Sequence, residues 1–158
     1  MFEEKEFVET VKVVVFRLIN EEYGVEVSQV KSIERFQPIT RVPNTPTFVK
    51  GVINLRGVIT PIIDLRSRFN LEEGPYTELT RLIIVILDDI EVGMIVDTAH
   101  DILDIPVDEI ESPPEVVGGI KADYLRGVAK VKENLYILLN LNKVLNMDEM
   151  RQLEKIEG

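Results

Sequence analysis

Several residue types are scarce in this chain of 158 residues, and each scarcity removes a class of function. Cysteine is absent, which excludes disulfide bonds and cysteine-ligated zinc and fits a reducing compartment. The single histidine, His100, therefore has no cysteine nucleophile to activate. None of the serines, Ser28, Ser32, Ser67 and Ser112, stands in a G-x-S-x-G turn. We expect no enzymatic activity.

Long apolar runs and basic blocks are also missing. The longest apolar run, LIIVIL at 82–87, suits a strand and is too short to cross a bilayer. The first ten residues lack a basic segment followed by an apolar one, so we expect no secretory signal and a soluble chain. A net charge of −10 repels phosphate backbones, which disfavours nucleic-acid binding.

Acidic residues gather in VDTAHDILD, where Asp97, Asp101 and Asp104 could suggest a metal-dependent hydrolase. Their spacing does not match a calcium loop, and aspartates are common where a strand meets a loop. The glycine pair at 118–119 lacks the lysine and helix start of a phosphate-binding loop. We therefore expect neither a metal nor a cofactor.

With 45% hydrophobic and 29% charged residues, the composition is globular, and the patterning is that of strands. The segment FRLINEEYGVEVSQV (16–30) predicts a β-hairpin with a polar turn at 20–22. VILDDIEVGMIVDTA (85–99) has the same layout, with its turn at 88–89 and Gly93 standing 69 residues after Gly24. The chain therefore contains a repeat.

A second echo supports the repeat. LRGV at 55–58 recurs at 125–128, an offset of 70, and IIDLRSRF (62–69) resembles LLNLNKVL (138–145), an offset of 76. We attribute the growth in spacing to a longer hairpin connection around 132–134 in the second copy. Chance similarity between two β-rich segments could explain the hairpin glycines alone, but the shared LRGV favours a duplicated β unit.

The repeat predicts an all-β fold of two small five-stranded barrels packed through a common apolar layer, because neither unit is large enough for an ample core of its own. We expect a disordered tail at 1–10, one domain at 11–158, a first barrel unit at about 11–80 and a second at 81–145. Helix is confined to LRSRF (65–69), capped by Asp64, and to the tail 146–158, where Leu145, Met150 and Leu153 form an apolar stripe.

The stretch VKGVINLRGVITPIIDL (49–65) sets two glycines and one arginine in an apolar run. A catalytic loop, a buried hairpin and a docking surface could each produce this pattern. Gly51 and Gly57 stand where glycine permits a bulge or a close backbone approach. Arg56 is either a surface residue whose stem covers the strand or an interface anchor.

With these segments in view, the chain resembles the CheW family of chemotaxis coupling proteins. The likeness is carried by EEYGVEVSQV (21–30), VPNTPTFVKGVINLRGVITPIIDLRSRF (42–69), VGMIVDTAHDIL (92–103) and YLRGVAKV with ILLNLNKVLNMDEM (124–150). The resemblance implies two joined SH3-like barrels and no catalysis. It further implies a cytoplasmic adaptor at receptor arrays on the inner face of the membrane, linking chemoreceptor tips to the regulatory domain of the histidine kinase CheA.

The resemblance also implies two sets of contact residues. The receptor-facing set is Val30, Ser32, Arg56 and Ile102, and the kinase-facing set is Lys50 and Ile59. For Val30 and Ile102 a core position is the ordinary alternative, because a β-branched residue in a strand is more often buried than exposed.

Three other functions compete with the adaptor. A CheA or CheV relative would need a kinase or receiver domain, for which this chain has no room. An oligonucleotide-binding small barrel would need interleaved basic and aromatic residues, whereas the chain is acidic and only 6% aromatic. A peptide-binding module of another kind also stays open.

Overall fold

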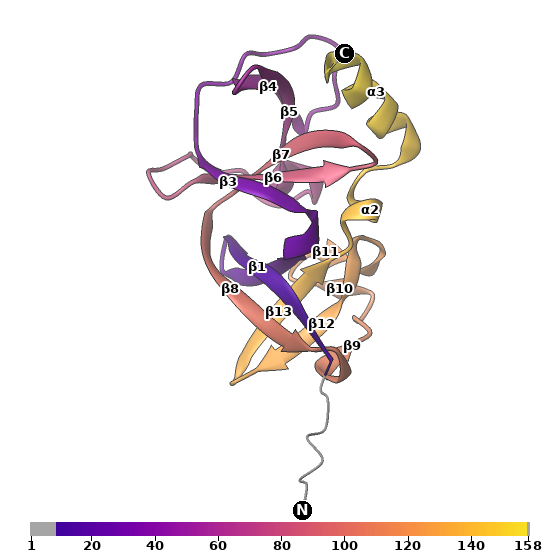
Figure 1. Cartoon of the computed structure of the whole chain (residues 1–158). Helices are drawn as coiled ribbons and strands as arrows, with labels where there is room; N and C mark the ends of the chain where they lie inside the picture. Colours follow the sequence, from indigo (N-terminus) through magenta and orange to yellow (C-terminus); the bar gives the residue numbers. More distant parts are fainter. Residues whose placement is uncertain (1–8, 158) are drawn as a thin grey trace, which may run out of the picture.

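The computed structural model describes residues 9–157 as two packed β-barrels with the two C-terminal helices on one side (Figure 1). Of the tail predicted at 1–10, residues 1–8 lie outside the described part, and the first strand already begins at Thr10. No helix in the described part is long and apolar enough to span a membrane.

Barrel A, the lower body in Figure 1, has the strand order β8-β1-β2-β13-β12-β9. Its elements are β1 (Thr10–Leu18), β2 (Glu21–Glu26), β8 (Thr98–Pro106), η2 (Val107–Glu109), β9 (Ile110–Glu111), β12 (Leu125–Val131) and β13 (Asn134–Leu139). Because β8 continues through η2 into β9, the two edges of this sheet belong to one bent segment, and the sheet closes as a five-stranded barrel.

Barrel B, the upper body, has the order β3-β6-β7-β5-β4. Its strands are β3 (Val30–Arg35), β4 (Val49–Leu55), β5 (Val58–Asp64), β6 (Arg81–Leu87) and β7 (Ile90–Val96). The chain beyond β3 returns to β4 through a bridge between Thr40 and Val52, which closes this sheet in the same way. The predicted all-β fold of two five-stranded units is confirmed.

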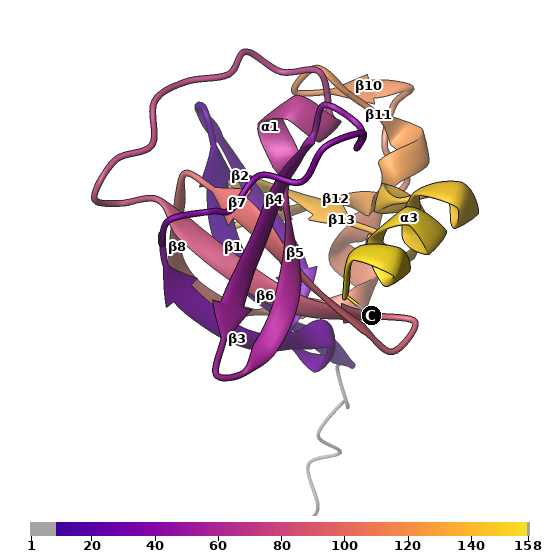
Figure 2. The ribbon, with the colours of Figure 1, turned by 90° about the horizontal axis from the view of Figure 1, so that it is seen from above.

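The remaining elements are short. They are η1 (Val27–Gln29), α1 (Leu65–Arg68), β10 (Val116–Val117), β11 (Ile120–Lys121), η3 (Ala122–Tyr124), α2 (Leu141–Val144) and α3 (Met147–Glu157). Seen from above, β10, β11 and α3 lie on one side of the molecule, and the loop between α1 and β6 lies on the other (Figure 2). The Asp64 cap is confirmed, since its Oδ1 accepts from the Arg66 backbone N–H at 2.9 Å.

The barrels do not follow the division predicted at residue 80. Hairpin β1–β2 pairs with β13 in barrel A, and hairpin β6–β7 pairs with β5 in barrel B, both in parallel. The chain therefore starts in barrel A, crosses at η1, completes barrel B and returns at Asp97. The repeat is real, but its hairpins are interleaved, so that the first hairpin of each copy pairs with a strand of the other copy.

Strand register also corrects the alignment of the repeat. Leu138 pairs with Gly24, and Ile62 pairs with Gly93, so the hairpin offset of 69 and the second offset of 76 are both confirmed. LRGV at 55–58, however, is the turn between β4 and β5, whereas LRGV at 125–128 opens strand β12. The residue equivalent to Gly127 in the repeat is Gly51, because each follows a bulge at the start of its strand. Hairpins β4–β5 and β12–β13 both have two-residue turns. The predicted longer connection around 132–134 is therefore wrong.

Glycine is required at Gly51 for two reasons. Its φ of +142° is unfavourable for other residues, and a Cβ placed there would lie 2.0 Å from the Thr40 carbonyl oxygen. Gly57 has open space around it but a φ of +88°, which the tight turn imposes. The predicted bulge and close approach are confirmed at Gly51, whereas Gly57 serves a turn, which was not predicted.

The core has three parts. Small clusters fill each barrel, Ile53, Leu55, Ile62, Leu82, Ile84 and Ile95 in barrel B and Val13, Val15, Ile105, Ala129 and Leu138 in barrel A. The largest cluster draws on both barrels and on the helices, and it includes Phe16, Tyr23, Ile63, Ile83 and Leu153. The predicted common apolar layer is confirmed, with Leu145 and Leu153 of the C-terminal stripe buried in it.

Candidate protein-binding surfaces

The first two receptor-facing candidates, Val30 and Ser32, lie on either side of a bulge in β3. Val30 pairs with Val85 of the shared core, whereas Ser32 pairs with Ile84 inside barrel B, and Lys31 is the extra residue between them. Both side chains are only partly exposed. Val30 packs against the shared core, so a core position describes much of its side chain.

Ile102 is different, because 56% of it is exposed. It pairs with Val14 of the shared core, so it lies on the face of β8 that is directed toward the other barrel. A core position for Ile102 is therefore wrong. Its side chain is therefore accessible to a partner.

Sequence reasoning missed the equivalent residue on the other barrel. This residue is Ile33, which is 42% exposed and pairs with Ile83. Ile102 pairs with Val14, and Val14 and Ile83 are equivalent because they are separated by the hairpin offset of 69. Ile33 and Ile102 thus occupy matching edge positions in barrels B and A. The hairpin repeat was visible in the sequence, but this match depends on the register of β3 and β8.

Arg56 occupies the first position of the β4–β5 turn with a φ of +51°, and its side chain is 72% exposed. Its two terminal nitrogens each lie 3.4 Å from a carboxylate oxygen of Glu34, which joins the turn to β3. The Asn54 side chain accepts from the Gly57 N–H at 2.9 Å and fixes the turn. Arg56 is therefore a surface residue with a directed guanidinium, and its donors remain accessible to a partner.

The kinase-facing candidates lie on the same hairpin. Lys50 is the bulged residue of β4, and its Nζ donates to Glu73 Oε1 at 2.8 Å, which lowers the pKa of Glu73. Ile59 of β5 is 39% exposed beside the 37% exposed Val58. The structure therefore brings Lys50, Arg56 and Ile59 onto one hairpin and leaves Ile102 on the other barrel.

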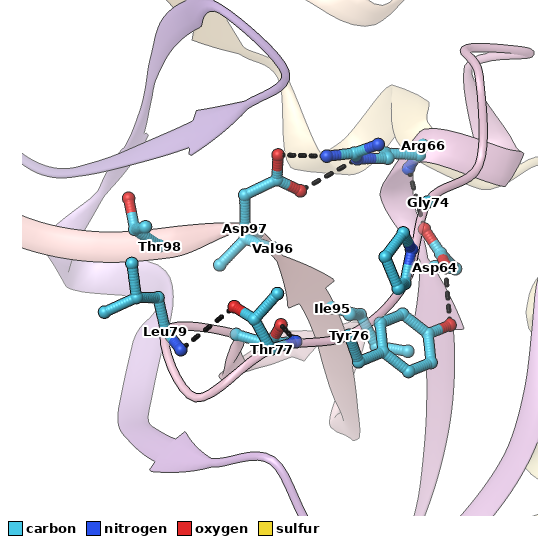
Figure 3. Close-up of a pocket in the computed structure, with 12 residues that line it drawn as sticks. Asp64, Arg66, Gly74, Tyr76, Thr77, Leu79, Ile95, Val96, Asp97 and Thr98 are labelled. Atoms are coloured by element: carbon cyan, nitrogen blue, oxygen red, sulfur yellow. Dashed lines mark hydrogen bonds and ion pairs between the residues drawn. The ribbon is translucent and has the colours of Figure 1, made fainter.

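Asp97, where the chain returns to barrel A, joins the two barrels (Figure 3). Arg66 of α1 donates through Nε to Asp97 Oδ1 at 2.8 Å and through a second nitrogen to Oδ2. The same Oδ2 accepts from the Ile19 N–H at 2.8 Å in the β1–β2 turn, which begins at Ile19 and not, as predicted, at Asn20. The contact with Asp97 raises the pKa of Arg66.

Beside this joint, the Tyr76 hydroxyl donates to Asp64 Oδ2 at 2.7 Å and holds the α1–β6 loop against barrel B (Figure 3). Burial and the Asp64 carboxylate raise the pKa of Tyr76. Asp64 Oδ1 is already occupied by the N-terminal N–H groups of α1. These contacts hold the α1–β6 loop and the start of α1 at the barrel junction.

The three aspartates of the metal hypothesis serve different partners. Asp97 binds Arg66, Asp101 accepts from the Ile102 N–H at 2.8 Å, and Asp104 lies 3.3 Å from Lys12. Within residues 9–157 no three His, Cys, Asp or Glu side chains are arranged to hold a metal. Each carboxylate therefore has a structural explanation.

Comparisons with known proteins bear on the same features. The profile of the CheW-like domain matches residues 12–149. The chemotaxis protein CheW of Bacillus subtilis is 45% identical over 137 residues, covering 87% of this chain and 88% of that protein. The CheW of Klebsiella aerogenes is 38% identical, covering 90% and 86%.

Among solved structures, the scaffolding protein TtCheW from Thermoanaerobacter tengcongensis matches with a TM-score of 0.82 at 33% identity. The match covers 94% of this chain and 96% of that one. Profile, sequences and architecture agree, and the chain belongs to the CheW-like domain family.

Proposed function

We propose that this protein is a non-enzymatic signalling adaptor of bacterial chemotaxis, which couples transmembrane chemoreceptors to the histidine kinase CheA at the inner face of the membrane. Family membership supports it, as do relatives named as chemotaxis proteins and a structural neighbour described as a scaffolding protein. Neither an oligonucleotide-binding barrel nor a peptide-binding module of a different kind finds support among these relatives, and the net charge of −10 opposes nucleic-acid binding.

The observation that carries the proposal is the exposure of Ile102 at the edge of β8. With Ile33 on the opposite barrel and part of Val30, it offers apolar surface beside the shared layer. A receptor helical hairpin would bury its own apolar stripe there, at about 25 cal/mol per Å² before ordering costs. Arg56 and Ser32 would supply polar contacts at the rim.

The kinase regulatory domain would bind the β4–β5 hairpin through Lys50 and Ile59. The partly exposed Ile59 would form a small apolar centre and Lys50 a charged rim. Protein–protein interfaces commonly have an apolar centre and a polar rim. The receptor and kinase surfaces meet at Arg56, so one short hairpin would report receptor contact to the kinase.

The test is Arg56→Glu, assayed by co-sedimentation of the variant with receptor-containing membranes and CheA. Because Arg56 is 72% exposed, we expect the fold to survive and assembly to be lost. Lys132→Glu is the matched control, since Lys132 takes the corresponding turn position of barrel A with a φ of +50°. A fully active assembly with Arg56→Glu, or equal loss with both variants, would contradict the proposed surface.

A further inference from the structure

An open pocket of about 400 Å³ lies where β1, β6 and β8 meet, beside the joint formed by Asp97. Its lining consists of Arg17, Leu79, Arg81, Thr98, Ala99 and His100. Two guanidinium groups and an imidazole thus converge on one depression of a chain whose net charge is −10. Leu79, 63% exposed, forms an apolar lip.

The two arginines of the pocket are held differently. Arg81 donates through Nη1 to the carbonyl oxygens of Glu78 and Thr80 at 2.8 and 2.9 Å, which orients its guanidinium without neutralising it. Arg17 shares Glu22 with His100, whose Nε2 lies 3.2 Å from Glu22 Oε2. Glu22 and the more distant Asp97 carboxylate offset the charge of Arg17, so the uncompensated positive charge at the pocket is that of Arg81.

Strand pairing adds a second, independent observation. Arg81 stands directly opposite Arg35 in the β3–β6 pair. Like charges facing each other across an antiparallel pair destabilise a sheet unless a counter-charge lies between or beside them. Within residues 9–157, neither Arg35 nor Arg81 forms an ion pair with a carboxylate. The barrel therefore holds an oriented, uncompensated arginine at the pocket wall.

We propose that this pocket binds an oxyanion, a carboxylate or a phosphate, through Arg81 and Arg17. Guanidinium groups pair with both anions by two parallel N–H donors. The anion comes either from a free small molecule or from an acidic side chain of a docked protein, whose neighbouring apolar group would cover Leu79. None of its lining residues belongs to the proposed receptor or kinase sets.

The experiment is an NMR titration of the isotope-labelled full chain with sodium phosphate and, in a second arm, with the blocked dipeptide acetyl-Leu-Glu-amide. Sodium chloride keeps the ionic strength constant, because screening alone shifts exposed charges. We expect saturable shifts at the amides of Leu79, Thr98 and His100 and at the side-chain Nε–H of Arg17 and Arg81. Tighter saturation by phosphate identifies a free anion, and tighter saturation by the dipeptide identifies an acidic side chain.

Substitution separates this site from general cation effects. Arg81→Gln should weaken saturation by at least about fivefold, and the exposed Arg17→Gln serves as a second variant should Arg81→Gln unfold. Arg126→Gln, which removes an exposed arginine paired with Glu26 on another face of barrel A, should change nothing. Linear shifts spread over all arginines, no saturation by either probe, or unchanged saturation in both pocket variants would overturn the site.

Discussion

The two barrels share their buried framework and differ on their surfaces. Asp64 and Asn140, 76 residues apart, each cap a short helix, and their N–H groups donate to the carbonyl oxygens of Phe48 and Tyr124 at 2.8 and 2.9 Å. Leu65 and its equivalent Leu141 are both buried. The duplication has therefore kept the hydrogen bonds and packing that close each barrel.

Arg68 shows how the equivalent parts meet. Its guanidinium lies over the ring of Phe48 at 4.8 Å and over the equivalent ring of Tyr124 at 5.0 Å. Its Nε donates to the carbonyl oxygen of Val144 at 2.6 Å, and Val144 is the equivalent of Arg68 itself. A residue that touches its own counterpart lies near a two-fold relationship, as at a symmetric dimer interface.

The surfaces have diverged around this framework. Strands β3 and β8 each contain a bulge with one extra residue. In barrel B this residue is Lys31, which pairs with Glu91, and in barrel A it is His100, which lies against Glu22. Glu91 follows Glu22 by the hairpin offset of 69, so the pair is kept in position but not in chemistry. The residues shared by the two copies therefore identify the positions that maintain each barrel, and the mismatches show where the two surfaces have diverged.

The largest expected effect comes from the glycines at the start of β4 and β12. Gly51→Ala should destabilise the fold by about 3 kcal/mol or more, because it combines an unfavourable φ with a collision against the Thr40 carbonyl. Gly127→Ala meets the Glu111 carbonyl at 2.6 Å without positive φ and should cost less, about 1–3 kcal/mol. Urea unfolding followed by circular dichroism measures the free energy of unfolding of each variant. Equal losses in the two variants would show that the positive φ of Gly51 adds no strain.

The next effect concerns the link between the barrels. Arg68→Met should cost about 2–3 kcal/mol, because in a mostly buried site it removes the donor to the Val144 carbonyl and the cation paired with Glu149, which keeps only the Asn146 N–H. Arg126→Met, which breaks a surface pair with Glu26, should cost at most about 1 kcal/mol. Comparable thermal shifts for the two variants would mean that Arg68 is only a surface residue.

A binding measurement sharpens the comparison between the hairpins. Ile59→Glu should weaken binding of the CheA regulatory domain about tenfold by placing a charge in the proposed apolar centre. Leu135→Glu changes the equivalent, 47% exposed position of barrel A and should leave this affinity unchanged. Isothermal titration calorimetry on folded variants measures this affinity. A loss with Leu135→Glu alone would indicate that the kinase binds barrel A instead of barrel B.

The smallest effect concerns Tyr23, whose barrel B counterpart is Val92. Its hydroxyl is buried without a hydrogen-bond partner in the described part of the chain, and burial raises its pKa to about 12. Tyr23→Phe should therefore change stability by less than about 1 kcal/mol at neutral pH.

The pH dependence of Tyr23 has a definite sign. A folded pKa above the unfolded value of about 10 gives stability that is complete below pH 10 and is lost as pH rises toward 12. The phenylalanine variant should lose less stability than the parent chain over that interval. Chemical unfolding at pH 7, 9 and 11 measures the difference, and parallel curves would show that the phenol is solvated.

Local features of the fold were predictable from sequence, because they depend on neighbouring residues. The Asp64 cap, the 88–89 turn and the C-terminal stripe follow from short-range rules and are confirmed. The LRGV match failed for a physical reason: Gly57 is needed for turn backbone angles, whereas Gly127 is needed for close strand approach. One tetrapeptide can therefore serve two different structures.

Long-range pairing could not be predicted. The parallel pairing of β5 with β7, the clamp between Arg66 and Asp97, and the register that makes Ile33 the counterpart of Ile102 all join segments through space. The six candidate residues were found by family resemblance, and their roles remain predictions. Their exposure, 56% for Ile102 against partial burial for Val30, required the register of the strands.

The crossings at η1 and Asp97 have a consequence for how the molecule can move or be divided. Cutting the chain between residues 80 and 81 would separate hairpin β6–β7 from its sheet partner β5, and likewise β1–β2 from β13. Neither half could fold alone, so the protein should unfold as one cooperative unit, with amide exchange rates in both barrels rising together as the fold is destabilised. A displacement of one barrel would therefore be transmitted to the other through the two chain crossings as well as through the packed side chains.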